Sequence, residues 1–306
     1  MKKRDRMFIK NTPLVTIGIS FFNAENTILD AIKSIFAQTY KNWELILIDD
    51  GSRDLALDLL NQINDPKINI ISDGINKKYP ARLNEIAILA KGKYIARMDA
   101  DDLCSPERIE LQVKFLEENP NIDLVGTGAA IIGENFEPFG KREVPSNHRE
   151  IIQSPLNGVR IVHPSSLGRT EWYKKNMYNP LIIRASDYDL WLRTYQFSTF
   201  ANITEPLYFY KEQKNYFWKL YSMVILRRKI KCMFDNINIL KNNVNIFYQL
   251  TKEIAKIIIC GLYTIVGKKE KYFRLRNKKL STKEIKKIKN DIKFIKEIIL
   301  PLKKNI

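Results

Sequence analysis

The chain has 306 residues, of which 45% are hydrophobic and 28% charged, so it can bury one α/β domain and still leave an appendage. The formal net charge of +17 does not indicate that this domain binds nucleic acid, because the excess of basic residues lies in the appendage. Residues 1–210 hold 26 basic and 27 acidic side chains, whereas residues 211–306 hold 25 and 7. The three cysteines are far apart, odd in number and lack metal-ligand spacing, so they indicate neither a disulfide framework nor a zinc site.

Apolar patterns alternate between strand and helix along the first 132 residues. Val15–Phe22 reads as a buried strand, and apolar residues then recur at helical spacing from Ile28 to Phe36. The further strands are expected over 44–48, 68–71, 94–98 and 123–132, and the helices over 54–63, over 80–90 and after Pro106. This alternation predicts a parallel sheet with right-handed crossovers and a doubly wound first half.

The rhythm changes after residue 134, where glycine and proline break the chain into short segments. A helix is expected over 187–195 and a last strand over 207–210. We therefore predict a domain over 1–210, with a nucleotide-binding half at 14–132 and an acceptor half at 133–210. Residues 211–306 are expected to form a basic, mainly helical extension.

Two acidic clusters directly follow apolar runs. Asp49 and Asp50 follow one predicted strand, and the Asp-x-Asp element at Asp99 and Asp101 follows another. Open α/β sheets deliver carboxylates to a ligand crevice at such strand ends. Crowded carboxylates repel one another, so a divalent cation or the N–H donors of a ligand would stabilise them. The pair indicates a metal and nucleotide site, although acidic residues that only cap the following helices are the alternative.

Four segments, in order, resemble the family 2 glycosyltransferases of GT-A fold. They are Val15–Asn23, Ser34–Tyr40, Glu44–Ser52 and Gly92–Asp102, and the similarity extends over about residues 14–210. The resemblance implies a Rossmann-related mixed sheet flanked by helices. It also implies inverting transfer of a sugar from a nucleotide-diphosphate donor, with UDP expected, to a glycan or lipid-linked acceptor in surface polysaccharide synthesis.

The resemblance also implies site residues. Ser20 and Asp49 would lie by the base of the nucleotide, and Asp50 would recognise that base. Asp99 would lie by the ribose and the diphosphate. Asp101, with Asp99, would hold Mn²⁺ or Mg²⁺. Asp187 takes the place of the general base, with Ser186 where the family usually has an acidic residue. Asp189 is expected to cap or pair instead.

Weaker candidates lie elsewhere in the matched region. His163 matches a segment near the donor diphosphate or the acceptor, although a structural hydrogen bond is the alternative. Arg169 takes the position of a basic residue of the family but could equally form a surface ion pair. Asp73, Lys78 and Arg82 are weak candidates at a loop that borders the donor in the family. The loop departs from the family pattern, because Lys78 stands two residues after Asn76, where the family usually has a glycine.

Two other function classes compete with this interpretation. A nucleotidyltransferase would also bind nucleotide and metal, but no glycine-rich phosphate loop with its lysine is present. A basic nucleic-acid-binding protein would explain the charged extension but not the acidic clusters, and no nucleic-acid partner is expected.

The extension contains a basic amphipathic segment. Five isoleucines between residues 285 and 299 share one helical face, and lysines occupy the others. Such a helix could lie on an anionic membrane surface through residues 256–300, or pack on the protein with a solvated lysine face. With no signal peptide or membrane-spanning run in the sequence, a cytoplasmic protein, peripheral on the inner face of the cell membrane, is expected.

Overall fold

The computed structural model describes residues 12–155, 158–212 and 277–303, together with positions 251, 254, 255 and 258. Most of residues 256–276, the first half of the stretch expected at a membrane surface, lie outside the described residues. The last strand ends at Lys211, next to the position where the domain boundary is predicted. No helix within the described ranges is both long and apolar enough to cross a bilayer.

The first half of the domain is a parallel sheet with helical crossovers, as the sequence predicts. Its strands have the order β3-β2-β1-β4, and all three pairings between them are parallel. The strands are β1 (Val15–Phe21), β2 (Trp43–Asp49), β3 (Ile68–Ser72) and β4 (Tyr94–Arg97). The helices are α1 (Ile28–Phe36), α2 (Ala56–Asn61), α3 (Tyr79–Leu89) and α4 (Arg108–Glu118).

The second half makes the sheet mixed. β8 (Leu167–Arg169) inserts antiparallel between β4 and β6 (Leu124–Ile132), and β6 then pairs parallel with β9 (Phe200–Lys211). The predicted strand at 123–132 therefore exists but does not continue the parallel winding. The remaining elements are β5 (Leu103–Cys104), β7 (Pro138–Arg142), α5 (His148–Ile151), the 3₁₀ turn η3 (His163–Ser165), α6 (Thr170–Lys175) and α7 (Ser186–Thr194).

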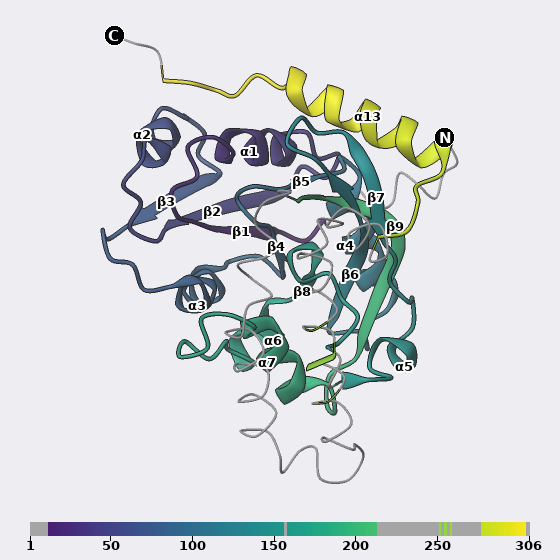
Figure 1. Cartoon of the computed structure of the whole chain (residues 1–306). Coiled ribbons are helices and arrows are strands. Elements are labelled where there is room, and N and C mark those ends of the chain that lie inside the picture. Colours follow the sequence, from purple (N-terminus) through teal and green to yellow (C-terminus); the bar gives the residue numbers. More distant parts are fainter. Residues whose placement is uncertain are drawn as a thin grey trace.

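Helices cover both faces of the sheet (Figure 1). Successive residues of β2 point to opposite faces, so Leu45 and Leu47 join the cluster that contains α1, α2 and α4, while Ile46 and Ile48 join α3, α6 and α7. The contact between α3 and β1 is tight, since a Cβ placed on Gly18 would lie 2.3 Å from Ile86 Cγ2. The sheet is thus buried on both sides, and only its strand ends can offer a site.

The described part of the extension packs on this domain. Its helix, α13 (Thr282–Glu297), begins with a capping box between Ser281 and Glu284. Ile288, Ile292 and Ile295 are buried in one cluster with residues of β5, β6 and β9. Of the two arrangements that the sequence leaves open, the structure therefore has the apolar face packed on the protein. Ile299 lies beyond the helix and is 90% exposed.

Candidate active site

The first acidic cluster lies at the carboxyl end of β2, and both of its aspartates are buried. Asp49 accepts hydrogen bonds from the backbone N–H of Ser52 at 2.9 Å and from the Ser72 hydroxyl at 2.8 Å. Oδ1 of Asp50 accepts bonds from the backbone N–H groups of Lys77 and Lys78, at 2.8 and 3.1 Å. Asp50, which is predicted to recognise the nucleotide base, therefore fixes the segment that enters α3.

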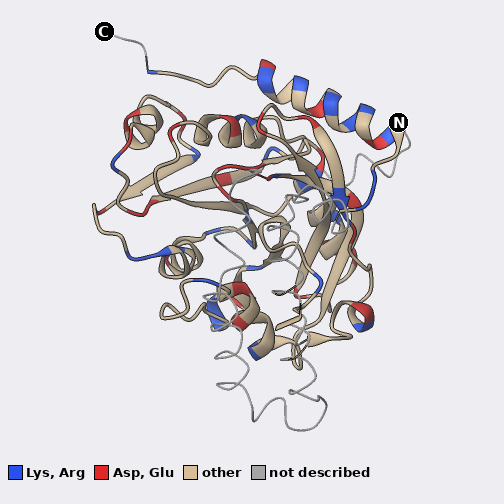
Figure 2. Cartoon of the chain, viewed as in Figure 1, with Lys and Arg blue, Asp and Glu red and all other residues tan. Residues whose placement is uncertain are grey.

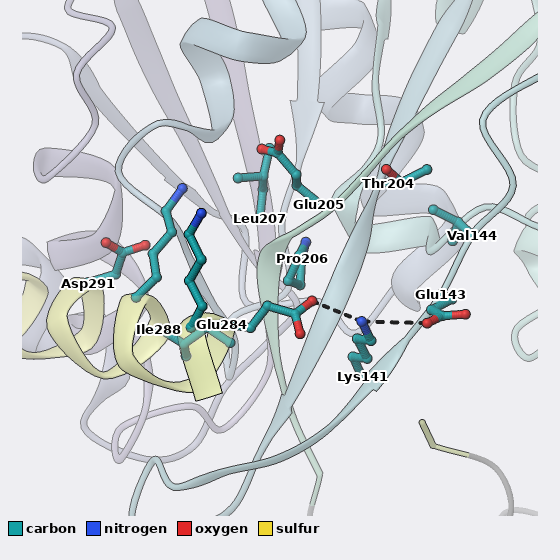
Figure 3. Close-up of a pocket in the computed structure, with 12 residues that line it drawn as sticks. Lys141, Glu143, Val144, Thr204, Glu205, Pro206, Leu207, Glu284, Ile288 and Asp291 are labelled. Carbon is teal, nitrogen blue, oxygen red and sulfur yellow. Dashed lines mark hydrogen bonds and ion pairs between the residues drawn. The ribbon is translucent and has the colours of Figure 1, made fainter. Parts of the chain in front are cut away.

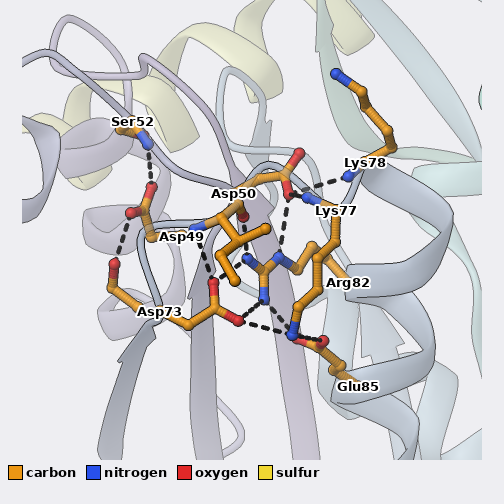
Figure 4. A network of polar contacts seen from close by, with 10 residues as sticks. Asp49, Asp50, Ser52, Asp73, Lys77, Lys78, Arg82 and Glu85 are labelled. Atoms are coloured by element: carbon orange, nitrogen blue, oxygen red, sulfur yellow. Dashed lines mark hydrogen bonds and ion pairs between the residues drawn. The ribbon is translucent and has the colours of Figure 1, made fainter.

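Arg82 is the centre of a polar network behind this cluster (Figure 4). Its side chain is fully buried, and its guanidinium donates to Asp50 at 3.1 Å, to Asp73 at 2.6 Å and to Glu85 at 2.7 Å. The hydrogen bonds from Arg82 and then from Lys77 hold the pKa of the Asp73 carboxyl well below its usual range. Arg82 and Asp73 thus bind one another in this structure, and their predicted contact with nucleotide stays a prediction.

Gly51 lets the loop after β3 approach the first cluster. Its φ is +78°, and a Cβ there would lie 3.1 Å from the backbone nitrogen of Asn76. The protein's own 74–76 loop thus lies against this glycine. A side chain at residue 51 would strain the turn and push this loop away from Asp50.

The second acidic cluster follows β4, and its three carboxylates differ in environment. Asp102 is buried and accepts hydrogen bonds from the Tyr208 hydroxyl at 2.8 Å and from the Lys211 backbone N–H at 2.7 Å. It therefore ties the acidic loop to β9. Asp101 reaches solvent, and the described residues provide no side-chain partner for it. Desolvation by the surrounding protein, and then the charge of Asp99, raise the pKa of Asp101 to about 6.

Arg97, the last residue of β4, holds Asp99 in place. Its guanidinium is almost fully buried and donates to Oδ1 of Asp99 at 2.7 Å. The Tyr79 hydroxyl, at the start of α3, donates to the same oxygen at 2.7 Å and accepts a bond from Arg97. One oxygen of Asp99 thus accepts both hydrogen bonds.

His163 connects Arg97 to the second half of the domain. Nη1 of Arg97 lies 2.9 Å from Nδ1 of His163, and Nε2 of His163 lies 2.7 Å from the Tyr178 hydroxyl. Nη1 of Arg97 also lies 3.3 Å from Nε2, and because a guanidinium only donates, we assign the acceptor role to the nearer Nδ1 and the proton of the neutral ring to Nε2. Desolvation and the neighbouring Arg97 charge lower the pKa of His163 well below its usual value, so the ring is neutral.

Asp187 lies in the first turn of α7 and is partly exposed. Ala185 before it has φ +61°, a left-handed conformation that turns the chain sharply into the helix. The charges of Asp187 and Asp99 both contribute, after burial, to raising the pKa of Tyr178. These contributions are smaller than those of burial and of Tyr173, and the meeting of Asp187 with Asp99 stays a prediction. Asp189 instead pairs with Arg193 at 2.9 Å.

The remaining predicted residues occupy two different places. Ser20 is buried at the carboxyl end of β1, next to the strand that carries Asp49. Arg169 donates to the backbone carbonyls of Ile122, Leu116 and Asn119, at 2.9 to 3.3 Å, where α4 ends. Its described contacts therefore anchor β8 to α4, and none of them reaches the other predicted site residues.

Asp99 and Asp101 could hold a divalent cation. Among the described residues no group of three or more His, Cys, Asp or Glu side chains forms a metal cage. Mg²⁺ and Mn²⁺ beside phosphates commonly use only one or two carboxylates, with the phosphates and water completing the shell. The carboxylates of Asp99 and Asp101 fit that pattern, and a cation would offset the burial and the Asp99 charge that raise the pKa of Asp101.

Three residues of this site are absent from the sequence-based candidates: Arg97, Tyr79 and Tyr178. Arg97 could have been found, because it is a charged residue at the end of an apolar strand and directly precedes the Asp-x-Asp element. The two tyrosines carry no comparable signal. Their partners are 20 residues away for Tyr79 and 15 for Tyr178, in other elements of the fold.

Comparison with known proteins identifies similar chains. Residues 16–177 match the family described as Glycosyl transferase family 2. EpsE of Bacillus subtilis (strain 168), whose name describes a candidate glycosyltransferase, is 37% identical over 67% of this chain and 75% of its own. WcaA of Escherichia coli (strain K12) is named as a candidate glycosyl transferase of colanic acid biosynthesis. It is 36% identical over 60% of this chain and 67% of its own.

Among solved structures, residues 1–349 of S. aureus TarS in complex with UDP have a TM-score of 0.54 and 17% identity to this chain. The match covers 78% of this chain and 70% of that one. At this identity the likeness concerns the fold, and it agrees with the predicted mixed sheet flanked by helices.

Proposed function

Because the chain belongs to glycosyl transferase family 2, we propose that it is an inverting hexosyltransferase that moves a sugar from a UDP-sugar donor to a hydroxyl of a glycan or lipid-linked acceptor. Membership of this family gives no support to the nucleotidyltransferase and nucleic-acid-binding alternatives. The name of WcaA supports a place in surface polysaccharide synthesis, and the UDP bound by TarS supports the choice of nucleotide.

One observation supports this function most directly. The contacts that run from Asp99 through Arg97 and His163 to Tyr178 join the end of β4 to the segment before α7. Asp187 acts electrostatically on the same Tyr178. This series of contacts ties the donor half to the acceptor half, which supports a transfer between two substrates bound where the halves meet.

In the proposed mechanism, Asp50 accepts the imide N–H of the base and Asp99 orients the ribose and diphosphate. Asp187 accepts the proton of the acceptor hydroxyl while the hydroxyl oxygen attacks the anomeric carbon. The bond to the diphosphate breaks on the opposite face, and the diphosphate leaves with the electron pair. Arg97 and Tyr79 keep Asp99 in position throughout, because both donate to its Oδ1.

Asp101 and Asp99 are the residues that would hold Mn²⁺ or Mg²⁺. A bound divalent cation supplies charge stabilisation to a departing diphosphate. Asp101 is the stronger of the two proposed ligands, because Asp99 already shares one oxygen with Arg97 and Tyr79.

The metal site is tested by titrating UDP into the protein with Mn²⁺ and with a chelator. We expect Asp101→Asn to lose the Mn²⁺-dependent part of UDP affinity, about tenfold or more. Asp58→Asn, at an exposed position of α2, removes the same charge elsewhere and should leave UDP affinity unchanged. Equal UDP affinity in chelator and in Mn²⁺ would show that UDP binding does not depend on a metal ion.

We also propose that the protein works in the cytoplasm at the anionic inner face of the cell membrane. Lys286, Lys289, Lys293 and Lys296 follow one another along one side of α13, and we call them the lysine stripe. No carboxylate of the described chain pairs with them. Three of them line a hollow of about 500 Å³ beside Phe136, and the Lys296 ammonium lies 3.9 Å from that ring.

The opposite flank of α13 is different (Figure 3). There Lys141 lies between Glu284 and Glu143, and Lys287 pairs with Glu107 at 2.6 Å. On that flank Lys287 is neutralised by the domain, whereas the lysine stripe remains available to an anionic partner. Figure 2 shows the basic residues recurring along the helix.

A further inference from the structure

Lys78 has a backbone conformation that normally belongs to glycine. Its φ is +73° and its ψ is 152°, a region essentially confined to glycine. The resemblance described above places a glycine at this position. Lys78 therefore places a long side chain on a turn that glycine usually makes. Backbone strain of this kind persists where the surrounding structure imposes it and is concentrated at functional sites.

The contacts around Lys78 impose this conformation. Its N–H donates to Asp50 at 3.1 Å, and its carbonyl accepts from the backbone N–H groups of Ala81 at 3.1 Å and Arg82 at 3.3 Å. The next residue, Tyr79, donates its hydroxyl to Asp99 at 2.7 Å. Residue 78 is thus bracketed by the two acidic clusters, with one bond to the first and an adjacent bond to the second.

The side chain of Lys78 is exposed and has no carboxylate partner in the described part of the chain. Lys77 differs, since its ammonium lies 2.7 Å from Asp73 and 2.9 Å from Glu85. Figure 4 shows the side chain of Lys78 leading away from the network around Arg82. The neighbouring lysines therefore have separate roles, one neutralised inside the network and one presenting a free positive charge at its rim.

We propose that Lys78 binds the diphosphate of the donor. This inference rests on the proposed function, in which the base lies at Asp50 and the diphosphate at Asp99 and Asp101. A nucleoside diphosphate bound in that way passes from one cluster to the other, alongside residue 78. A lysine ammonium is a compact cation suited to phosphate oxygens, and it would offset the negative charge that both clusters bring to the ligand.

The test compares UDP with uridine, which has the same base and ribose but no phosphate. In Mn²⁺, Lys78→Met should weaken UDP binding about tenfold to a hundredfold, the loss expected for a hydrogen bond to a charged group. Uridine affinity, measured by competition, should not change. Lys91→Met removes an exposed lysine elsewhere and should leave both affinities unchanged.

Lys78→Gly separates charge from backbone strain. It should weaken UDP binding as Lys78→Met does, yet raise the melting temperature, because the strained Cβ is gone. Unchanged UDP affinity in Lys78→Met would overturn the proposed role of Lys78 but not the proposed function of the protein. Failure of the unmodified protein to bind UDP would overturn the proposed function and this inference together.

Discussion

Arg97 is the residue at which the two halves of the candidate site meet. It donates to Asp99 on the donor side and to His163 on the acceptor side. Its burial and its fixed fork of donors mean that a lysine could not make both contacts in the same geometry. The positions of Asp99 and of the segment around Tyr178 are therefore coupled through one guanidinium.

His163 should make folding stability sensitive to pH. Its pKa is lowered in the folded protein, so below the ordinary histidine value near 6.5 the unfolded chain takes up a proton that the folded chain does not. This contribution to stability is present above pH 6.5 and is lost as the pH falls, at up to about 1.4 kcal/mol per pH unit. Unfolding in urea at several pH values between 7.5 and 5 measures it.

In that measurement His163→Gln should lose less stability on acidification than the unmodified protein. His148→Gln provides the comparison, because the pKa of His148 is lowered less strongly, and its effect on the pH slope should be smaller. Parallel pH profiles for the unmodified protein and His163→Gln would show that His163 is not held neutral.

At the scale of elements, α13 is an anchored helix and not a free amphipathic one. Its three central isoleucines are buried against the domain, and the Ser105 hydroxyl donates to Asp291 at 2.7 Å. Ser105 directly follows β5, and β5 directly follows the second acidic cluster, so this bond anchors α13 three residues beyond that cluster. The helix can meet a membrane only through its charged outer side.

The lysine stripe should therefore bind anionic vesicles through charge. Each lysine near such a surface contributes about 1 kcal/mol. The triple change of Lys289, Lys293 and Lys296 to Gln should weaken partition onto phosphatidylserine-containing vesicles by about a hundredfold at low salt. Co-sedimentation of the full chain measures this effect, and added salt should weaken binding of the unmodified protein.

The matched control changes Lys91, Lys114 and Lys175 to Gln, three exposed lysines of the domain. It removes the same total charge and should bind vesicles as the unmodified protein does. Equal binding by both triple variants would mean that net charge, and not the lysine stripe, attracts the protein. Binding of the full chain to RNA but not to vesicles would favour the nucleic-acid alternative.

At the scale of the whole molecule, local patterns predicted the parallel half well. β1, β2 and β4 are buried on both faces and α1 has an apolar stripe, so a single stretch of sequence contains most of the signal for each of them. β8 has three residues and β5 has two, which is too short for any periodicity. Their places are set by pairing with distant strands, and the mixed half of the sheet could be expected only by resemblance.

The same distinction applies to the site. The acidic clusters stand out because carboxylates follow apolar runs directly. The network that positions them is non-local: Arg82 meets Asp50 across 32 residues, and Arg97 meets His163 across 66. Such contacts depend on how the chain folds, and no single segment of the sequence records them.

The central claim is that the acidic clusters bind the donor while Asp187 carries out the chemistry. The most direct test measures UDP affinity and turnover of the UDP-sugar for Asp187→Asn, with Asp189→Asn on the same helix as control. We predict unchanged UDP affinity and turnover reduced by about a hundredfold or more for Asp187→Asn, and near-normal turnover for the control. Normal turnover by Asp187→Asn would contradict the account.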